Sequence, residues 1–228
     1  MKLCDLTLPT PEENLACDEA LLDLCEAGGS DELLRLWALP QYFVVVGYAN
    51  QAATEVNLRF CRKLAIPVLR RCTGGGTVLQ GPGVLNYSLI LRINDSGPCH
   101  TIPATNRFIL ERHRDALANL LSAPVEWRGQ TDLALGGLKF AGNAQRRRRR
   151  FLLFHGSFLL RLDFGLLERI LPLPSRQPDY RLNRSHSEFL INLNLPDHAI
   201  KAALTQAWNA TGPLDPIPFD QITLLTRQ

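Results

Sequence analysis

The chain has 228 residues, of which 46% are hydrophobic and 21% are charged, and its formal net charge is +3. This length and apolar content suffice for one sizeable core and exclude global disorder. The small net charge gives no general argument for nucleic-acid binding. No apolar run approaches the length of a membrane span, and the start of the chain lacks the apolar region of a signal peptide. We therefore expect a cytoplasmic protein without a membrane partner.

The spacing of the six cysteines indicates reduced thiols. They are widely spaced, form no C-x-x-C pair and show no metal-ligand spacing with the five histidines. Free thiols agree with a cytoplasmic location.

The first half of the chain alternates helix and strand patterns. Helical spacing of apolar residues is followed by Gly28 and Gly29, which favour a helix end. Branched and aromatic residues predict strands, and a turn at Pro40 joins the first two. The predicted elements are a helix over 14–27, strands over 33–37 and 42–47, a helix over 54–65, and strands over 66–71 and 84–93.

The second half contains a hairpin and two further helices. Its predicted elements are a helix over 101–121, a hairpin over 131–144 around Gly136 and Gly137, a strand over 151–162 and a helix over 197–208. Strands outnumber helices and several are joined by hairpins, so we predict an α+β fold with a central mixed, largely antiparallel sheet. We expect one domain over 1–228, with 209–228 as a short C-terminal tail packed on it.

The stretch "RRCTGGGTVLQGPGVLNYS" (70–88) combines three glycines with two arginines. Adjacent glycines allow successive amide groups to converge on an anion. Arg70 and Arg71 alternate along a strand, so only one faces the loop, and we favour Arg71 as a partner of phosphate or carboxylate. Alone, the stretch also fits a hairpin turn with solvated arginines. It contains neither standard glycine-rich nucleotide motif.

A second stretch, "GQTDLALGGLKFAGNAQ" (129–145), is here called the lysine hairpin. Asp132 opens its first strand, Lys139 follows the turn, and Gly142 permits close backbone approach. A lysine at this point is a mobile charge that can bridge two oxygens of a mixed anhydride. By itself, the pattern also fits a solvent-facing hairpin lysine.

Together these stretches resemble the lipoate-protein ligase A family of the biotin and lipoate ligase superfamily. That family carries R-R-x-[ST]-G-G-G-x-V and L-N-x-S motifs, which match residues 70–78 and 85–88. It also carries a D-[LI]…G-x-K-x-x-G-x-A-Q hairpin and an H-G-[ST] strand. The matching residues are Asp132, Gly137, Lys139, Gly142, Ala144, Gln145, His155, Gly156 and Ser157. "NLACDEALL" and "LLRLW" resemble the family's opening helix and first strand, and the likeness covers roughly residues 10–210.

The resemblance implies the class II synthetase-like catalytic fold, a sheet flanked by helices, and an ATP-dependent ligase. In that family lipoate or octanoate reacts with ATP to give acyl-AMP, and a lysine of an acceptor domain then takes the acyl group. A magnesium ion is expected with ATP. The acceptor would be an acidic lipoyl domain, such as that of an E2 subunit, the glycine cleavage H protein or a similar carrier.

The resemblance also implies roles for individual residues. Lys139 would be catalytic, Asp132 would reach the adenosine end, and Asn86 would lie near the metal and phosphates. The implied contacts to substrate or adenylate are Arg71, Thr73, Gly74, Gly75, Gly76, Thr77, Val78, Asn86, Asp132, Gly142, Asn143 and Ala144.

Two departures from the family pattern stand out. Gln80 and Gly81 occupy positions where the family commonly has histidine and aspartate, which puts one polar ligand contact in question. Two-domain members of the family also continue into a small accessory domain, and we expect none in this chain. Either a separate small protein supplies that function or this domain is self-sufficient.

Other functions stay open at this stage. Relatives on the same fold transfer octanoyl groups through a cysteine thioester, with the nucleophile just before the lysine hairpin. The corresponding segment, "VEWRGQTD" (125–132), has no cysteine, although Cys72 lies beside arginines that could activate a thiol. A non-catalytic lipoyl-binding protein is a further alternative. A biotin-protein ligase is disfavoured because no G-R-G-R-x motif occurs.

The arginine run at 146–150 is interpreted first as a solvated patch at a strand edge. It has no interleaved aromatic residues, which disfavours nucleic acid. Steering of an acidic acceptor domain is the functional alternative. His155 and Ser157 are interpreted as strand residues near the site, because no nucleophile elbow of a hydrolase is present.

Overall fold

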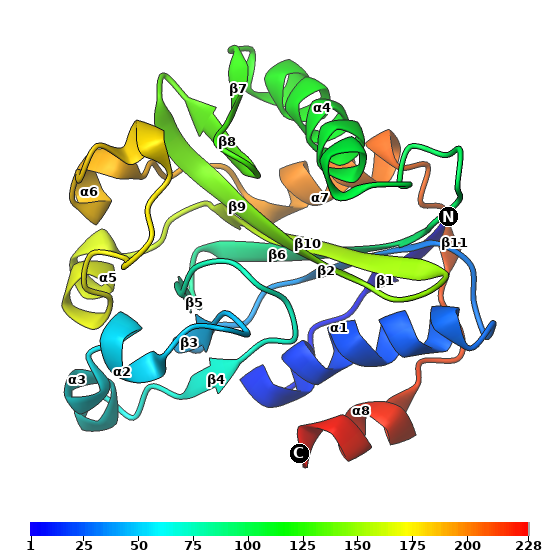
Figure 1. Cartoon of the computed structure of the whole chain (residues 1–228), viewed down its shortest axis with the longest axis horizontal. Helices are drawn as coiled ribbons and strands as arrows, with labels where there is room; N and C mark the ends of the chain where they lie inside the picture. Colours follow the sequence, from blue (N-terminus) through cyan, green and yellow to red (C-terminus); the bar gives the residue numbers. More distant parts are fainter. Residues whose placement is uncertain (228) are drawn as a thin grey trace.

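The computed structural model describes residues 1–227, in which an eight-stranded sheet and a three-stranded sheet are surrounded by helices (Figure 1). The strands are β1 (Lys2–Asp5), β2 (Leu33–Trp37), β3 (Phe43–Val46), β4 (Val68–Arg70), β5 (Val78–Gln80), β6 (Val84–Arg92), β7 (Val125–Arg128), β8 (Asp132–Leu135), β9 (Leu138–Arg147), β10 (Phe151–Leu159) and β11 (Gly212–Pro213). The helices are α1 (Pro11–Glu26), α2 (Ala52–Glu55), α3 (Leu58–Lys63), α4 (Ile102–Leu121), α5 (Phe164–Ile170), the 3₁₀ turn η1 (Asp179–Arg181), α6 (His186–Phe189), α7 (Asp197–Ala207) and α8 (Phe219–Thr226).

The large sheet has the order β11-β1-β2-β6-β10-β9-β8-β7, and the small sheet has the order β4-β3-β5. In the large sheet β1 pairs in parallel with β11 and β2, and every other neighbouring pair is antiparallel. The predicted α+β fold with a mixed, largely antiparallel sheet is therefore confirmed.

The two faces of the large sheet are covered by different helices. Leu85, Tyr87 and Leu89 of β6 belong to the core that includes α4 and α7, whereas Ile90 of β6 packs with α1. Figure 1 shows α4 and α7 on one side of the sheet and α1 and α8 on the other. Because side chains alternate along a strand, Asn86 and Ser88 share the α1 face with Ile90.

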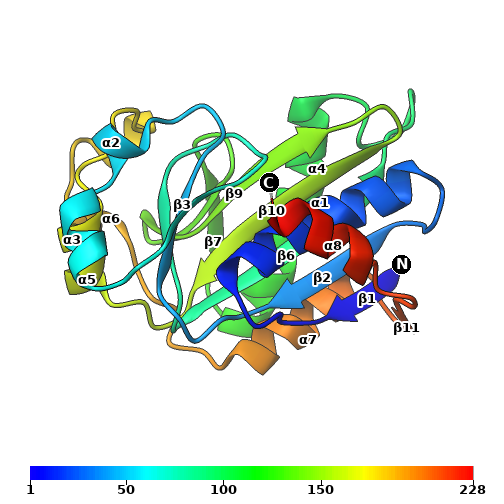
Figure 2. The same cartoon turned by 90° about the horizontal axis from the view of Figure 1, so that it is seen from below.

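The segment after α7 packs on the rest of the structure. β11 extends the sheet edge, and α8 lies along α1 in both views (Figures 1 and 2). Ile222 of α8 is buried in the same apolar cluster as Leu21 of α1. No helix within residues 1–227 combines the length and the apolar character needed to cross a bilayer.

Some predicted elements differ from the structure. The helix predicted over 54–65 is two short helices, because Val56 is extended and the Asn57 side chain caps a new helix at Phe60 N. The strands on either side of Pro40 do not pair: β2 lies in the large sheet and β3 in the small one. Strands β1, β5, β7 and β11, the 3₁₀ turn η1 and helices α5, α6 and α8 were not predicted.

Candidate active site

The glycine loop, defined as residues 73–76, folds around the Arg71 side chain. Arg71 Nη2 donates to the carbonyls of Gly74 and Gly76, both at 2.7 Å, and Nε donates to Gly74 as well. Burial lowers the pKa of Arg71 to about 10, so its guanidinium is still charged at neutral pH. The prediction that Arg71 faces this loop is confirmed, but these hydrogen bonds go to loop carbonyls.

Arg70 holds the neighbouring loop. Its Nη1 donates to the carbonyls of Gly47, Tyr48 and Asn50, each at 2.8 Å. That loop in turn touches the glycine loop, since Asn50 Nδ2 donates to Gly75 O at 3.1 Å. Both arginines therefore organise loop backbone, although Arg70 is exposed and only Arg71 is partly buried.

All four carbonyls of the glycine loop accept hydrogen bonds, the one at Thr73 from the Tyr48 amide at 2.8 Å. By contrast, none of the three glycine amides donates a hydrogen bond to any group in residues 1–227. The loop is exposed at Gly74, Gly75 and Gly76. A backbone segment whose carbonyls are occupied and whose amides are open is suited to binding an anion.

Beside this loop, the sheet presents a row of polar and small residues on its α1 face. Asn86, Ser157, Gly142 and Asp132 are direct neighbours across β6, β10, β9 and β8. The Ser157 hydroxyl donates to Asn86 Oδ1 at 2.7 Å. Residues separated along the sequence thus form one polar strip.

Lys139 lies at the end of this strip. Its ammonium pairs with Asp132 Oδ1 at 2.8 Å, and the Tyr180 hydroxyl donates to Asp132 Oδ2, also at 2.8 Å. A side chain at Gly142 would bring its Cβ within 2.7 Å of the lysine Nζ, so the glycine leaves room for the ammonium. Lys139 is a half-buried ion-pair partner, which corrects the alternative of a freely solvated hairpin lysine.

The loop and the lysine approach the same strand. A Cβ on Gly75 would lie 3.6 Å from the Ala144 Cβ, while the Lys139 ammonium lies over Gly142. Gly142 and Ala144 are two residues apart on one face of β9, or roughly 7 Å. The open amides and the ammonium therefore border one short stretch of sheet.

Several functional-site candidates were missed from the sequence. Asp18 of α1 and Arg35 of β2 form a buried ion pair at 2.6 Å, and Asp18 also contacts His155 Nδ1 at 3.2 Å. His155 Nε2 lies 2.7 Å from the Thr73 hydroxyl. A signal was present, because Asp18 and Arg35 each occupy a position where the surrounding pattern is apolar, while His155 was already interpreted as a strand residue near the site.

Gln80, at the position where the resembled family commonly has histidine, joins the polar strip. Its Nε2 donates to the Ser157 hydroxyl at 2.7 Å, while its Oε1 is buried and has no partner within residues 1–227. The neighbouring Gly81 has φ +140° and lies against the backbone of Tyr42, so a side chain there would be strained. The departure from the family pattern thus keeps one polar group on the strip.

The remaining predicted site residues lie around this arrangement. Thr77 and Val78 are half-buried where the glycine loop enters β5, and the Thr77 hydroxyl has no partner in the described chain. The structure corrects the predicted contact of the Asn143 side chain with the substrate. It accepts from the Tyr87 hydroxyl and donates to Thr131 O, both at 2.6 Å, on the opposite face of β9. Alternation along the strand removes this side chain from the strip.

None of the cysteines has an activated thiol. Burial raises the pKa of Cys72 to about 11, and it raises those of Cys17 and Cys25 to about 12. The pKa values of Cys4, Cys61 and Cys99 are also raised, mainly by burial. The arginines near Cys72 therefore do not make it a thiolate at neutral pH.

The arginine run differs from the predicted solvated patch. Arg146 pairs with Glu19 at 2.9 Å, and Arg148 pairs with Asp23 at 3.0 Å, both on α1. Arg147 donates to the carbonyl of Cys99 at 2.7 Å. Only part of the run is thus available for steering, because an acidic helix face lies against it.

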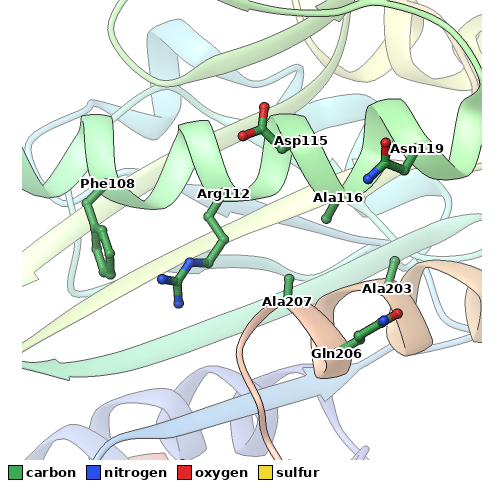
Figure 3. Close-up of a pocket in the computed structure, with 8 residues that line it drawn as sticks. All are labelled: Phe108, Arg112, Asp115, Ala116, Asn119, Ala203, Gln206 and Ala207. Carbon is green, nitrogen blue, oxygen red and sulfur yellow. The ribbon is translucent and has the colours of Figure 1, made fainter.

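A separate groove of about 530 Å³ lies between α4 and α7. Figure 3 shows its lining, with Arg112 and Asp115 on α4 and Gln206 on α7. It is on the other side of the large sheet from the polar strip and contains none of the predicted site residues.

Residues 10–195 match the family model described as "Lipoyl protein ligase A/B catalytic domain". The chain therefore belongs to the lipoyl protein ligase A/B catalytic domain family.

Curated relatives fall into two groups. Lipoate-protein ligase A subunit 1 of Thermoplasma acidophilum is 29% identical, over 82% of this chain and 74% of its own length. Octanoyltransferase LipM of Carboxydothermus hydrogenoformans is 31% identical, over 76% of this chain and 70% of its own. The chain is thus an enzyme-family member with both ligases and acyltransferases among its relatives.

A solved structure of lipoate-protein ligase A bound with ATP is 24% identical and superposes with a TM-score of 0.81. It covers 99% of this chain and 92% of that one. This likeness establishes the fold predicted from the resemblance.

Proposed function

We propose that this protein is an ATP-dependent lipoate-protein ligase that forms lipoyl-AMP or octanoyl-AMP and passes the acyl group to a lysine of a lipoyl domain. The observation that carries the proposal is the glycine loop beside the polar strip. Its four carbonyls accept hydrogen bonds, whereas the amides of its three glycines donate none within residues 1–227. Acyl-adenylate formation concentrates negative charge on a phosphate, which such a site can bind.

In the first half-reaction an oxygen of the acyl carboxylate attacks the α-phosphorus of ATP, and pyrophosphate leaves. The amides of Gly74, Gly75 and Gly76 would hold oxygens of the reacting carboxylate or phosphate, with the charge of Arg71 beneath them. Lys139 would offset charge on the anhydride bridge after exchanging its contact with Asp132 for the ligand. Fixed donors aimed at developing charge act strongly in a partly dry site.

In the second half-reaction a lysine amine of the acceptor attacks the acyl carbonyl, and AMP leaves. Asn86, Thr77 and Gln80 are polar groups at the strip that would contact the adenylate. Asp132 would reach the adenosine end. The solved ligases bound with ATP or with lipoic acid support these two ligands as substrates.

Magnesium would come with the nucleotide. No group of three or more His, Cys, Asp or Glu side chains in residues 1–227 is arranged to hold a metal ion. Mg²⁺ commonly depends on substrate phosphates for much of its coordination. None of the steps above depends on a metal ion held by the protein alone.

Octanoyl transfer through a cysteine thioester is the second candidate, because relatives named octanoyltransferase LipM reach 31% identity. The raised pKa of every cysteine opposes it, as does the lack of a cysteine in residues 125–132. We therefore favour the ligase.

We also propose an acidic lipoyl-domain acceptor and a separate small accessory protein. A similar archaeal system is described as a bipartite lipoate protein ligase with its E2 lipoyl domain. Ligation by this chain should therefore rise when such an accessory protein is added. Robust turnover at micromolar enzyme without one would instead show a self-sufficient ligase.

The deciding experiment supplies purified protein with ATP, Mg²⁺ and octanoate, and detects octanoyl-AMP and pyrophosphate. A parallel reaction supplies octanoyl-acyl-carrier protein without ATP, and intact-protein mass spectrometry looks for an acyl-enzyme thioester. Adenylate in the first reaction supports the ligase. A thioester that is lost in the Cys72→Ser variant, without adenylate, would establish the transferase instead.

A further inference from the structure

A line of four side chains, three of them buried and His155 13% exposed, runs from the interior to the base of the glycine loop. Arg35 Nη1 donates to Asp18 Oδ1 at 2.6 Å, and Asp18 Oδ2 lies 3.2 Å from His155 Nδ1. His155 Nε2 lies 2.7 Å from the hydroxyl of Thr73. The side chains come from β2, α1, β10 and the loop, so this line connects three elements to the candidate anion site.

The direction of these hydrogen bonds follows from the charge on Asp18. Burial alone would raise the pKa of Asp18, but Arg35 and His155 outweigh burial and hold the pKa below its usual value. A carboxylate accepts only, so His155 Nδ1 carries a proton toward it. In the neutral imidazole, Nε2 then accepts the hydroxyl proton of Thr73.

Thr73 is held from two sides. Its side chain rests on His155, and its carbonyl accepts from the Tyr48 amide at 2.8 Å. Only 1% of the residue is exposed, although the next three residues are exposed glycines. Three consecutive glycines have little intrinsic preference for one conformation, so an anchored residue at their start is what can order them.

We propose that Asp18 and His155 are positioning residues that hold Thr73 and thereby keep the amides of the glycine loop aimed at the substrate. Neither side chain touches the substrate. The inference rests on the proposed function only in naming the anion as an acyl-adenylate. The gain is preorganisation, since a loop already in its bound conformation loses less entropy on binding.

A matched pair of variants distinguishes the contact of His155 Nδ1 from that of His155 Nε2. An asparagine amide reaches about as far as Nδ1, so His155→Asn keeps a contact with Asp18 and loses the one with Thr73. A glutamine amide reaches about as far as Nε2, so His155→Gln keeps a contact with Thr73. Thr73→Val removes the hydroxyl at nearly constant volume, and Thr73→Ser retains it.

The first readout is ¹⁵N relaxation of the Gly74, Gly75 and Gly76 amides in the ligand-free protein. His155→Asn and Thr73→Val should lower the order parameters of these amides, from near 0.85 toward about 0.6. His155→Gln and Thr73→Ser should leave them near the wild-type values. Unchanged order parameters in both His155→Asn and Thr73→Val would overturn the proposal.

The second readout is affinity for octanoyl-sulfamoyl-adenosine, a stable analogue of octanoyl-AMP, measured by calorimetry. Affinity should fall about tenfold in His155→Asn and Thr73→Val, and less than about threefold in the two conservative variants. Equal losses in His155→Asn and His155→Gln would contradict a role through Thr73. If wild type fails to bind the analogue while the amide order changes as expected, the positioning role stands and the ligase function fails.

Discussion

The glycine loop rests on buried charges, whereas the lysine hairpin holds its charge near the surface. Beneath the loop, Arg35 and Asp18 have 0% and 3% of their side chains exposed. In the hairpin, Lys139 and Asp132 have 26% and 11% exposed. A buried pair keeps one geometry, but a partly solvated pair can exchange partners at low cost. We therefore expect the loop to keep one conformation, whereas the Lys139 side chain can move from Asp132 to a ligand.

The largest effect should follow from breaking the buried pair. Asp18→Ala leaves Arg35 charged and without an ion-pair partner in the interior, which should cost about 4 kcal/mol of stability. Chemical denaturation of wild type and variant measures the difference. A loss under about 1 kcal/mol would show that the loop does not rest on this pair.

The same pair predicts a pH dependence. The pKa of Asp18 is lower in the folded protein than in the unfolded chain. Asp18 therefore contributes fully to the free energy of unfolding above about pH 4, the pKa of an aspartate in the unfolded chain. This contribution is lost as pH falls through the folded pKa. Stability of wild type should therefore drop below about pH 4, and Asp18→Asn should show a smaller acid-dependent change.

Removing the ammonium group of Lys139 should reduce activity without affecting folding. Lys139→Ala should reduce adenylate formation by about a hundredfold or more, equivalent to roughly 2.7 kcal/mol of barrier, with an unchanged thermal midpoint. Lys201→Ala is the control, since Lys201 forms a similar ion pair with Asp5 at 2.7 Å outside the strip. Adenylate formation within about threefold of wild type would show that Lys139 has another role.

A smaller effect should come from Tyr180, which anchors Asp132 in the lysine hairpin. Tyr180→Phe removes the 2.8 Å hydrogen bond and retains the ring. Lys139 should then be less well oriented, and adenylate formation should fall about fivefold, or roughly 1 kcal/mol. Steady-state pyrophosphate release measures this, with the thermal midpoint as the check that folding is intact.

The smallest effect should come from the end of the arginine run. Because Arg146 and Arg148 pair with α1, we expect Arg149 and Arg150 to contribute the remaining steering. Arg149→Gln with Arg150→Gln should slow acyl transfer to an acidic acceptor less than about threefold and reduce its salt dependence, with adenylate formation retained. Equal slowing of both half-reactions would indicate a structural role.

The short-range features of this molecule were predictable. Two consecutive glycines at a hairpin turn, Gly136 and Gly137, have φ values of 54° and 77°, as a tight primed turn requires. Strand β2 has the predicted bounds, and α4 begins within one residue of the predicted start. Such features depend on the conformational propensities and the spacing of residues that are close together in the sequence, so a short segment of the sequence is enough to predict them.

The amino-acid sequence by itself thus determined the main helices and strands, the α+β class and the two motif-bearing stretches that meet at the site. Only the tertiary structure decided that Asp18 contacts His155 across 137 positions and that His155 contacts Thr73 across 82. It also decided that Asn143 faces away from the strip and that the arginine run meets an acidic helix. These contacts depend on which elements pack together and on which faces, and local spacing does not specify that.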